Sequence, residues 1–141
     1  KLKKKGLIRA HGLSVHSLVA LEAAVRESWV DSMHARINPY GVKMDVKSPE
    51  DVPKVAMVLK ALRKQGKAVI GMKILGEGAF RNSDEKRDTS IKYALESGCM
   101  DAMVVGFEKV SEIDDFAARV RKVKSYAKAT PARVRRMARL A

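Results

Sequence analysis

The chain has 141 residues, of which 46% are hydrophobic and 32% are charged, with a net charge of +13; the composition is typical of one globular domain. A single cysteine, Cys99, excludes an internal disulfide and a cysteine-rich zinc site, and favours a reducing compartment such as the cytoplasm. No apolar run approaches the roughly 18 residues of a membrane span, no signal peptide is visible, and the first residue, Lys1, leads us to expect a fragment or a processed product.

The first half of the chain alternates two short apolar runs with two helical patterns. We expect strands at 7–13 and at about 30–37, because both runs are short and end near Gly or Asn-Pro. One helix lies between them. A second helix begins where Ser48 is the cap and Pro49 takes the first helical position, and it ends at Gly66.

The second half repeats the alternation. Strands are expected at 68–75 and 101–105, each closed by a glycine. A third helix begins at Ser83 or Asp84, and a fourth is capped by Ser111. The order is therefore βαβαβαβα, which favours a parallel sheet with right-handed crossovers.

Two architectures satisfy this order: an open doubly wound sheet, and part of a (β/α)8 barrel. A four-stranded piece of a barrel has two unpaired edges. It would need four further strands, or a second copy of itself, to close.

The excess positive charge lies at the two ends of the chain. Residues 3–5, followed by Gly6, are typical of the last turn of a helix and its left-handed glycine cap. The mixed charge run at 84–88 is interpreted as a solvated helix start. Cys99 is interpreted as a small buried hydrophobic residue.

Nine lysines and arginines lie between Arg119 and Arg139. We interpret them as the solvated face of a terminal helix, and we expect a domain at 1–128 followed by a basic tail or helix at 129–141. The alternative is a basic module that binds nucleic acid or another polyanion. Tyr126 is the one aromatic residue within this stretch, which argues against single-strand binding.

The ends of the four expected strands resemble those of the aldo/keto reductase family. Residues 9–17 (RAHGLSVHS) resemble its fifth barrel strand, 35–39 (ARINP) its sixth, 70–78 (IGMKILGEG) its seventh, and 104–115 its eighth with the helix start that follows. The resemblance implies the C-terminal half of a (β/α)8 TIM barrel, with about four parallel βα units. It also implies NAD(P)H-dependent reduction of a small carbonyl compound, with NADP or NAD as the cofactor.

The resemblance assigns a set of residues to the cofactor site, at the strand ends where barrel enzymes place their sites. They are Ser14, His34, Lys73, Leu75, Gly76, Gly78, Gly106, Lys109 and Asp115. Each has an ordinary alternative, such as a turn hydroxyl for Ser14 or a tight turn for Gly76 and Gly78. Gly106 precedes a helix start that we expect to offer free N–H groups to a phosphate.

The sequence departs from the family at several of these positions. Val15 replaces an asparagine of the nicotinamide clamp, and Phe116 replaces an asparagine near the adenine. Phe107 and Glu112 stand where the family contacts the 2′-phosphate, and Lys109 is a candidate substitute. These departures leave NADPH and NADH both open.

In the family, the residues of carbonyl reduction are a tyrosine, a lysine, an aspartate and a histidine on strands two to four. The resemblance begins after those strands, so no catalytic residue is assigned in this chain. Tyr40, Tyr93 and Tyr126 do not match the motif of the acid. We therefore expect the chain to need a missing N-terminal half-barrel or a second copy, and to be inactive alone.

Overall fold

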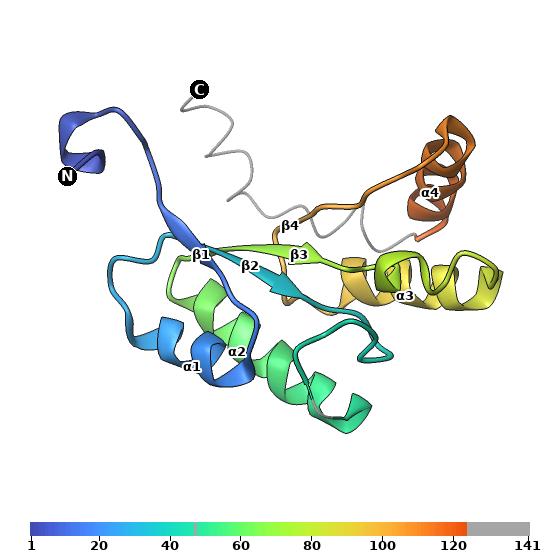
Figure 1. Cartoon of the computed structure of the whole chain (residues 1–141), viewed down its shortest axis with the longest axis horizontal. Coiled ribbons are helices and arrows are strands. Elements are labelled where there is room, and N and C mark those ends of the chain that lie inside the picture. The colour runs from blue at the N-terminus through green and yellow to red at the C-terminus, as the bar shows by residue number, and fades with distance from the viewer. Residues whose placement is uncertain (47, 124–141) are drawn as a thin grey trace.

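Four parallel strands form one sheet in the order β1-β2-β3-β4, and each strand is followed along the chain by an α-helix (Figure 1). The computed structural model describes residues 1–46 and 48–123. The elements are β1 (Gly12–Ser14), α1 (Leu18–Arg26), β2 (Ser32–Arg36), α2 (Val52–Lys64), β3 (Ala68–Met72), α3 (Asp84–Glu96), β4 (Ala102–Met103) and α4 (Val110–Lys122). The strand order has no reversal of the kind that defines a doubly wound sheet.

Serine caps begin the helices near the places that the sequence predicts. Ser17 Oγ accepts a hydrogen bond from the backbone N–H three residues on at 3.1 Å, and Ser83 Oγ does the same at 3.2 Å. Ser48 begins a short 3₁₀ turn, η2 (Pro49–Asp51), which leads directly into α2. The caps satisfy N–H groups that have no partner within the helix.

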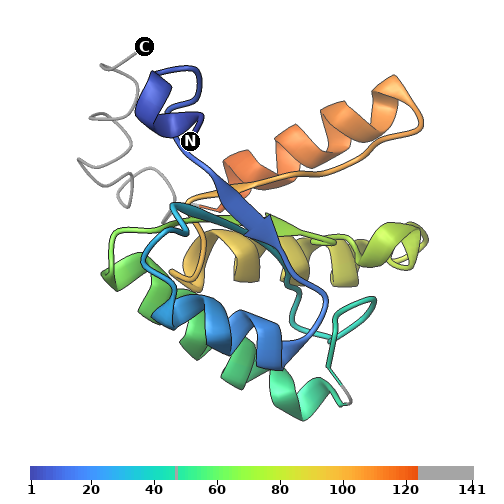
Figure 2. The same cartoon turned by 60° about the vertical axis from the view of Figure 1, so that its left-hand side comes forward.

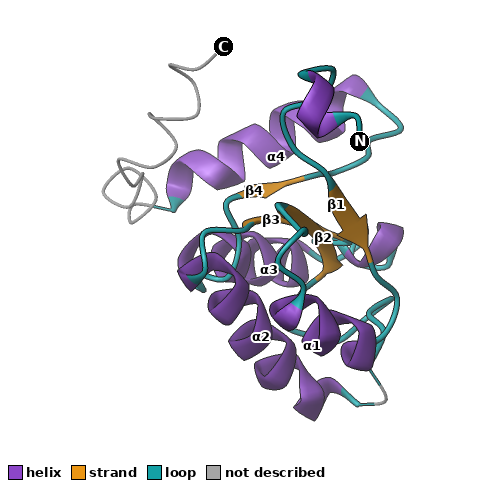
Figure 3. Ribbon diagram, turned by 90° about the vertical axis from the view of Figure 1, so that its left-hand side faces the viewer, coloured by secondary structure: helices purple, strands orange, loops and turns teal. Residues whose placement is uncertain are grey.

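One face of the sheet packs on the helices and forms the core. Met33 and Ala35 of β2 are buried there, and Val69 of β3 lies beside Met33 in the parallel register. Helices α1, α2 and α3 lie on this side of the sheet, with α1 and α2 packed together (Figures 1 and 3). Other members of the core are Leu21, Val30, Ile37, Val55, Leu59, Leu62 and Ile74.

The opposite face of the sheet is not covered by α1, α2 or α3 (Figure 2). It carries His34 and Arg36 of β2 with Ile70 and Met72 of β3, all half-buried. Within the described residues, β1 and β4 each pair with one strand, so each presents a free edge. Because parallel sheets are almost always covered on both faces, this face and these edges are suited to further packing.

The strands are shorter than the apolar runs predict. β1 covers Gly12–Ser14 and not 7–13, and Leu7 is exposed, because this edge strand has a partner only where it runs beside β2. β3 ends at Met72, because Lys73 has a φ of 57°, which is outside the strand region. β4 likewise keeps only two residues of its expected run.

The expected helix end at the N-terminus is confirmed. Lys3–Lys5 form a 3₁₀ turn, and Gly6 closes it with a φ of 70°. No helix in the described part of the chain is long and apolar enough to cross a membrane. The expected boundary between 1–128 and the basic segment 129–141 lies outside the described residues.

Lys67 closes the carboxyl end of α1 from the neighbouring βα unit. The residue is buried, and its Nζ donates hydrogen bonds to the backbone carbonyls of Ala24 (2.7 Å), Val25 (3.2 Å) and Glu27 (2.7 Å). The last carbonyls of a helix lack partners within it, and a cation there complements the helix dipole. Lys67 therefore ties α1 to the start of β3.

The substitution Lys67→Met should lower the free energy of unfolding by about 2–3 kcal/mol, because it leaves buried carbonyls without their charged donor. Urea denaturation measures the change. Lys64→Met, at an exposed lysine of α2, is the control and should stay within about 0.5 kcal/mol of wild type. Equal losses in the two variants would contradict a stabilising role for the buried ammonium.

Candidate functional site

A cleft of about 850 Å³ opens where the carboxyl ends of β3 and β4 meet. One wall is the loop after β3, which includes Leu75 and Gly78, together with Arg87 of α3. The other wall is the loop after β4, which includes Gly106, and the first turns of α4. The volume falls within the range of about 300–1,000 Å³ that is common for small-molecule sites.

The cleft brings together five of the residues that the sequence assigns to a cofactor site. They are Lys73, Leu75, Gly78, Gly106 and Asp115. They come from the ends of two different strands and from a helix, so only the fold places them together. The sequence predicts that residues at the ends of parallel strands share one end of the sheet, and these five line one cleft there.

Gly76 belongs to the same loop but lies beneath its surface. Its φ is 61°, and a Cβ at this position would lie 2.9 Å from Cζ of Phe80. Gly78 has a φ of 88° and open space where a Cβ would lie. Packing therefore requires the first glycine, while the second exposes backbone to the cleft.

Besides Gly76, three assigned residues lie outside the cleft lining. Ser14 and His34 are partners in the register of β1 and β2, on the face that α1, α2 and α3 leave uncovered. Lys109 is the exposed residue that precedes α4. Ser14, Gly76 and Gly106 all lie at or beyond the carboxyl ends of their strands, so they share one end of the sheet.

The loop after β3 holds two non-glycine residues in the left-handed region. Lys73 and Glu77 both have a φ of 57°, and their side chains form an ion pair. The carbonyl of Lys73 accepts hydrogen bonds from Asn38 Nδ2 at 3.1 Å and from the Gly76 N–H at 2.9 Å. Backbone conformations of this kind persist where the surroundings enforce them, and they cluster at ligand sites.

Asn38 organises two neighbouring loops at this end of the sheet. Its side chain is fully buried, and its Oδ1 accepts hydrogen bonds from the N–H groups of Tyr40 and Val42, both at 3.1 Å. Its Nδ2 donates to the Val42 carbonyl at 2.7 Å as well as to that of Lys73. One amide therefore fixes the loop after β2 and joins it to the loop after β3.

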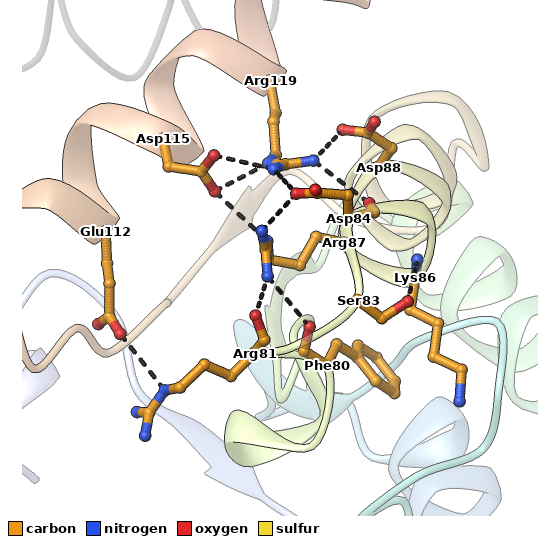
Figure 4. Close-up of polar contacts among 10 residues, drawn as sticks. All are labelled: Phe80, Arg81, Ser83, Asp84, Lys86, Arg87, Asp88, Glu112, Asp115 and Arg119. Carbon is orange, nitrogen blue, oxygen red and sulfur yellow. Dashed lines mark hydrogen bonds and ion pairs between the residues drawn. The ribbon is translucent and has the colours of Figure 1, made fainter.

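Arg119 of α4 is buried among three aspartates and holds α4 against α3 (Figure 4). Its guanidinium binds Asp88 at 2.6 Å and Asp115 at 2.8 Å, and it also contacts Asp84. Arg87 joins the network through Asp84 at 2.5 Å and Asp115 at 3.4 Å. The hydrogen bonds from Arg119 lower the pKa of the Asp115 carboxyl.

The network confirms one interpretation from the sequence and corrects another. The run at 84–88 is a largely exposed helix start as predicted, and Asp84 and Asp88 also bind Arg119 of α4. Arg119 is not on a solvated face, because it is 9% exposed. The i,i+4 spacing of Asp115 and Arg119 is the sequence signal that could have predicted this ion pair. Such pairs are also common on exposed helix surfaces, so the spacing does not predict burial.

A carboxylate of the chain lies at the start of α4, so two of the backbone N–H groups that follow Gly106 already have a partner. Glu112 accepts hydrogen bonds from the backbone N–H groups of Glu108 at 2.8 Å and Lys109 at 3.4 Å. The bond from Glu108 is the main cause that lowers the pKa of Glu112. The helix consequently begins at Val110, ahead of the cap predicted at Ser111.

Sequence reasoning missed an arginine at the mouth of the cleft. The Arg81 side chain is 49% exposed and binds Glu108 at 2.6 Å and Glu112 at 3.4 Å. The rings of Phe107 and Phe116 meet edge to face, with centroids 5.5 Å apart, and give this wall an apolar surface. No motif marks Arg81, because its position depends on the path of the loop after β3.

Cys99 lies before β4, at the end of the sheet opposite the cleft. It is fully buried, and burial raises the pKa of its thiol. Its Sγ lies 2.9 Å from Ser97 Oγ. The expectation of a buried hydrophobic role is confirmed.

Comparisons of the chain with protein-family models, with curated proteins and with solved structures find no match.

The substitution Arg119→Met should lower the free energy of unfolding by about 1–3 kcal/mol at neutral pH, since it leaves three carboxylates close together. Asp115 has a lowered folded-state pKa, so the ion pair stabilises the protein above the ordinary carboxyl pKa of about 3.9 and this contribution is lost as pH falls through the folded pKa. The difference between variant and wild type should therefore shrink in acid.

Urea denaturation at about pH 7 and about pH 3 tests this. Arg121→Met, at an exposed arginine of the same helix, is the control. A loss for Arg119→Met that is independent of pH would argue for lost packing rather than lost ion pairs.

Proposed function

We propose that the chain is the cofactor-binding half of an aldo/keto reductase-like (β/α)8 barrel, which reduces carbonyl compounds with a nicotinamide dinucleotide. The observation that carries the proposal is the shared cleft: Lys73, Leu75, Gly78, Gly106 and Asp115, chosen from family motifs, line one hollow at the carboxyl end of the sheet. Barrel enzymes place their sites at this end, and their last two loops commonly bind phosphate.

The sheet supports the barrel part of the proposal. Its strands follow one another in chain order, and α1, α2 and α3 lie on the same side, as in three successive units of a barrel wall, while α4 lies toward the other side (Figure 2). The uncovered face would then be the barrel interior. The free edges of β1 and β4 would pair with four further strands, supplied by an N-terminal half or by a second copy.

Several cleft residues support a dinucleotide as the ligand. Arg81 is half-exposed and would exchange its pairs with Glu108 and Glu112 for the pyrophosphate, and the loop at Leu75 and Gly78 offers backbone groups at close range. Phe107 and Phe116 offer apolar surface for a base. The bound cofactor would supply a hydride, and these residues would hold and orient it.

The acid that protonates the carbonyl oxygen belongs, on this proposal, to the other half of the barrel. Burial raises the pKa of Tyr93 to about 12, so its phenol is a poor acid. Tyr40 packs edge to face on Phe80, with centroids 5.1 Å apart. Neither phenol lines the cleft.

The purified chain should therefore bind a reduced nicotinamide dinucleotide without oxidising it in the presence of an aldehyde. The measurement is the loss of reduced-nicotinamide absorbance over time, with a catalytically complete reductase as the positive control. Steady turnover by the chain alone would place an acid within it and refute the division of roles.

Gly78→Asp should abolish the thermal stabilisation that a nicotinamide dinucleotide gives to the wild-type chain, since it adds a carboxylate to the cleft loop. Gly98→Asp is the matched control: Gly98 has a φ of 68° and open space around it, but it lies at the opposite end of the sheet. Both variants carry the same kind of backbone strain, so only the site differs.

The expected result is a rise in Tm with nucleotide for wild type and Gly98→Asp, and no rise for Gly78→Asp. An absence of any rise in the wild-type chain at millimolar nucleotide would sink the proposed function. Equal rises in all three proteins would move the binding site away from this cleft.

A further inference from the structure

A polar cluster surrounds Arg36, the last residue of β2. Arg36 lies on the face of the sheet that α1, α2 and α3 leave uncovered, and its guanidinium contacts His16 from the loop after β1 and Asp45 from the loop after β2. We call these three residues the Arg36 cluster. Barrel enzymes take residues that meet the substrate from the carboxyl ends of their strands, which is the position of this cluster.

The guanidinium of Arg36 is held firmly on one side only. Its Nη1 donates to Asp45 Oδ1 at 2.8 Å, and both side chains are largely buried. Its Nη2 lies 3.0 Å from Nδ1 of His16, a residue that is exposed. Its Nε is buried and has no hydrogen-bond partner within the described residues. Because buried N–H donors rarely lack an acceptor, Nε points to a ligand as its partner.

The donors that Asp45 does not use match a carboxylate. Nε and Nη2 lie on the same edge of the guanidinium, and such an edge donates two parallel hydrogen bonds to the two oxygens of a carboxylate. A ligand carboxylate would replace the His16 imidazole at Nη2 and would give Nε its acceptor. Since His16 is exposed, its side chain can turn away without opening the core.

Positive charge is in excess around the cluster. The pKa of Glu77 is lowered first by its hydrogen bond from Lys73 and further by the charges of Lys43 and Arg36. These three cations therefore lie near one another, with Glu77 and Asp45 as the carboxylates among them. An excess of one positive charge favours an anion that carries a single negative charge.

The cluster borders the candidate cleft. Lys73 and Glu77 line the cleft, and Arg36 pairs in register with Met72, the residue before Lys73. The backbone N–H of Ile37 donates to the Met72 carbonyl at 2.9 Å, so the end of β2 is fixed beside this loop. In the proposed barrel, Arg36 would face the interior next to the bound cofactor, where a substrate must lie to receive a hydride.

We propose that Arg36 binds the anionic end of the substrate, and that the substrate is an aldehyde or ketone that carries a carboxylate. The carboxylate accepts hydrogen bonds from Nε and Nη2, while Asp45 keeps the guanidinium in place through Nη1. This inference rests on the proposed function and names the substrate class of that site.

The test compares 4-oxopentanoate, a ketone with a carboxylate, with its neutral methyl ester. Titration of the whole chain followed by NMR gives the dissociation constants, and the arginine Nε–H resonances show where the ligand binds. The wild-type chain should bind the acid about tenfold more tightly than the ester, because the ester loses the charged hydrogen bonds. The Arg36 Nε–H resonance should shift with the acid. This comparison needs no variant, so it does not depend on how a variant folds.

Arg36→Lys provides the matched variant. It keeps a cation for Asp45 but lacks the two-donor edge, so it should reduce the preference for the acid to about twofold. Arg26→Lys, at an exposed arginine that ends α1 at the opposite end of the sheet, is the control and should keep the wild-type preference. An unchanged preference in Arg36→Lys would contradict the role of the guanidinium.

Dihydroxyacetone phosphate tests the kind of anion. It is a ketone with a phosphate, and its second negative charge would meet Asp45 and Glu77, so it should bind more weakly than 4-oxopentanoate. Tighter binding of the phosphate would overturn the assignment of a carboxylate.

The outcomes separate this inference from the proposed function. If the chain binds a nicotinamide dinucleotide but binds the acid and the ester equally, only the inference fails. If it binds 4-oxopentanoate through Arg36 but binds no dinucleotide, the proposed function fails and the carboxylate site stands without its role in reduction.

Discussion

Arg119 and its three aspartates set the distance between α3 and α4, and the cleft depends on that distance. The carboxyl ends of β3 and β4 alone would give two separate loops and no shared cleft between them. Because the guanidinium donates hydrogen bonds to carboxylates of both helices, α4 is held beside α3 and its first turns face the loop after β3. The same contacts place Asp115 at the junction, where it both lines the cleft and belongs to the network. A residue that the family motif marks for a ligand is therefore also part of the frame.

The order and type of the elements could be predicted from the sequence, and the reasons are local. Apolar runs closed by glycine or Asn-Pro predict the strands, and Ser48 and Ser83 predict the starts of two helices. Strand lengths could not be predicted in the same way. They depend on hydrogen bonds to a neighbour, which β1 has along one edge only, and on the turn of Lys73 out of the strand region.

The site was predictable only where its residues follow strand ends. Lys73, Leu75, Gly78 and Gly106 were chosen by resemblance to family motifs, and they lie near one another because parallel strands deliver their carboxyl ends to one edge of the sheet. Arg81 and the ion pairs of α3 with α4 could not be chosen in this way. Long side chains reach partners far away in the chain, and the choice of partner depends on how two helices pack, which no short motif encodes.

The amide of Asn38 has a consequence for how the molecule can vary. Since it grips both its own loop and the carbonyl of Lys73, these two βα units cannot change shape independently at their carboxyl ends. An insertion after β2 would displace Asn38, and this displacement would move the neighbouring turn and the backbone beside the cleft. Differences in ligand preference should therefore arise more readily on the α4 side. Ion pairs between side chains hold its loop to the rest of the protein, and a single substitution can change an ion pair.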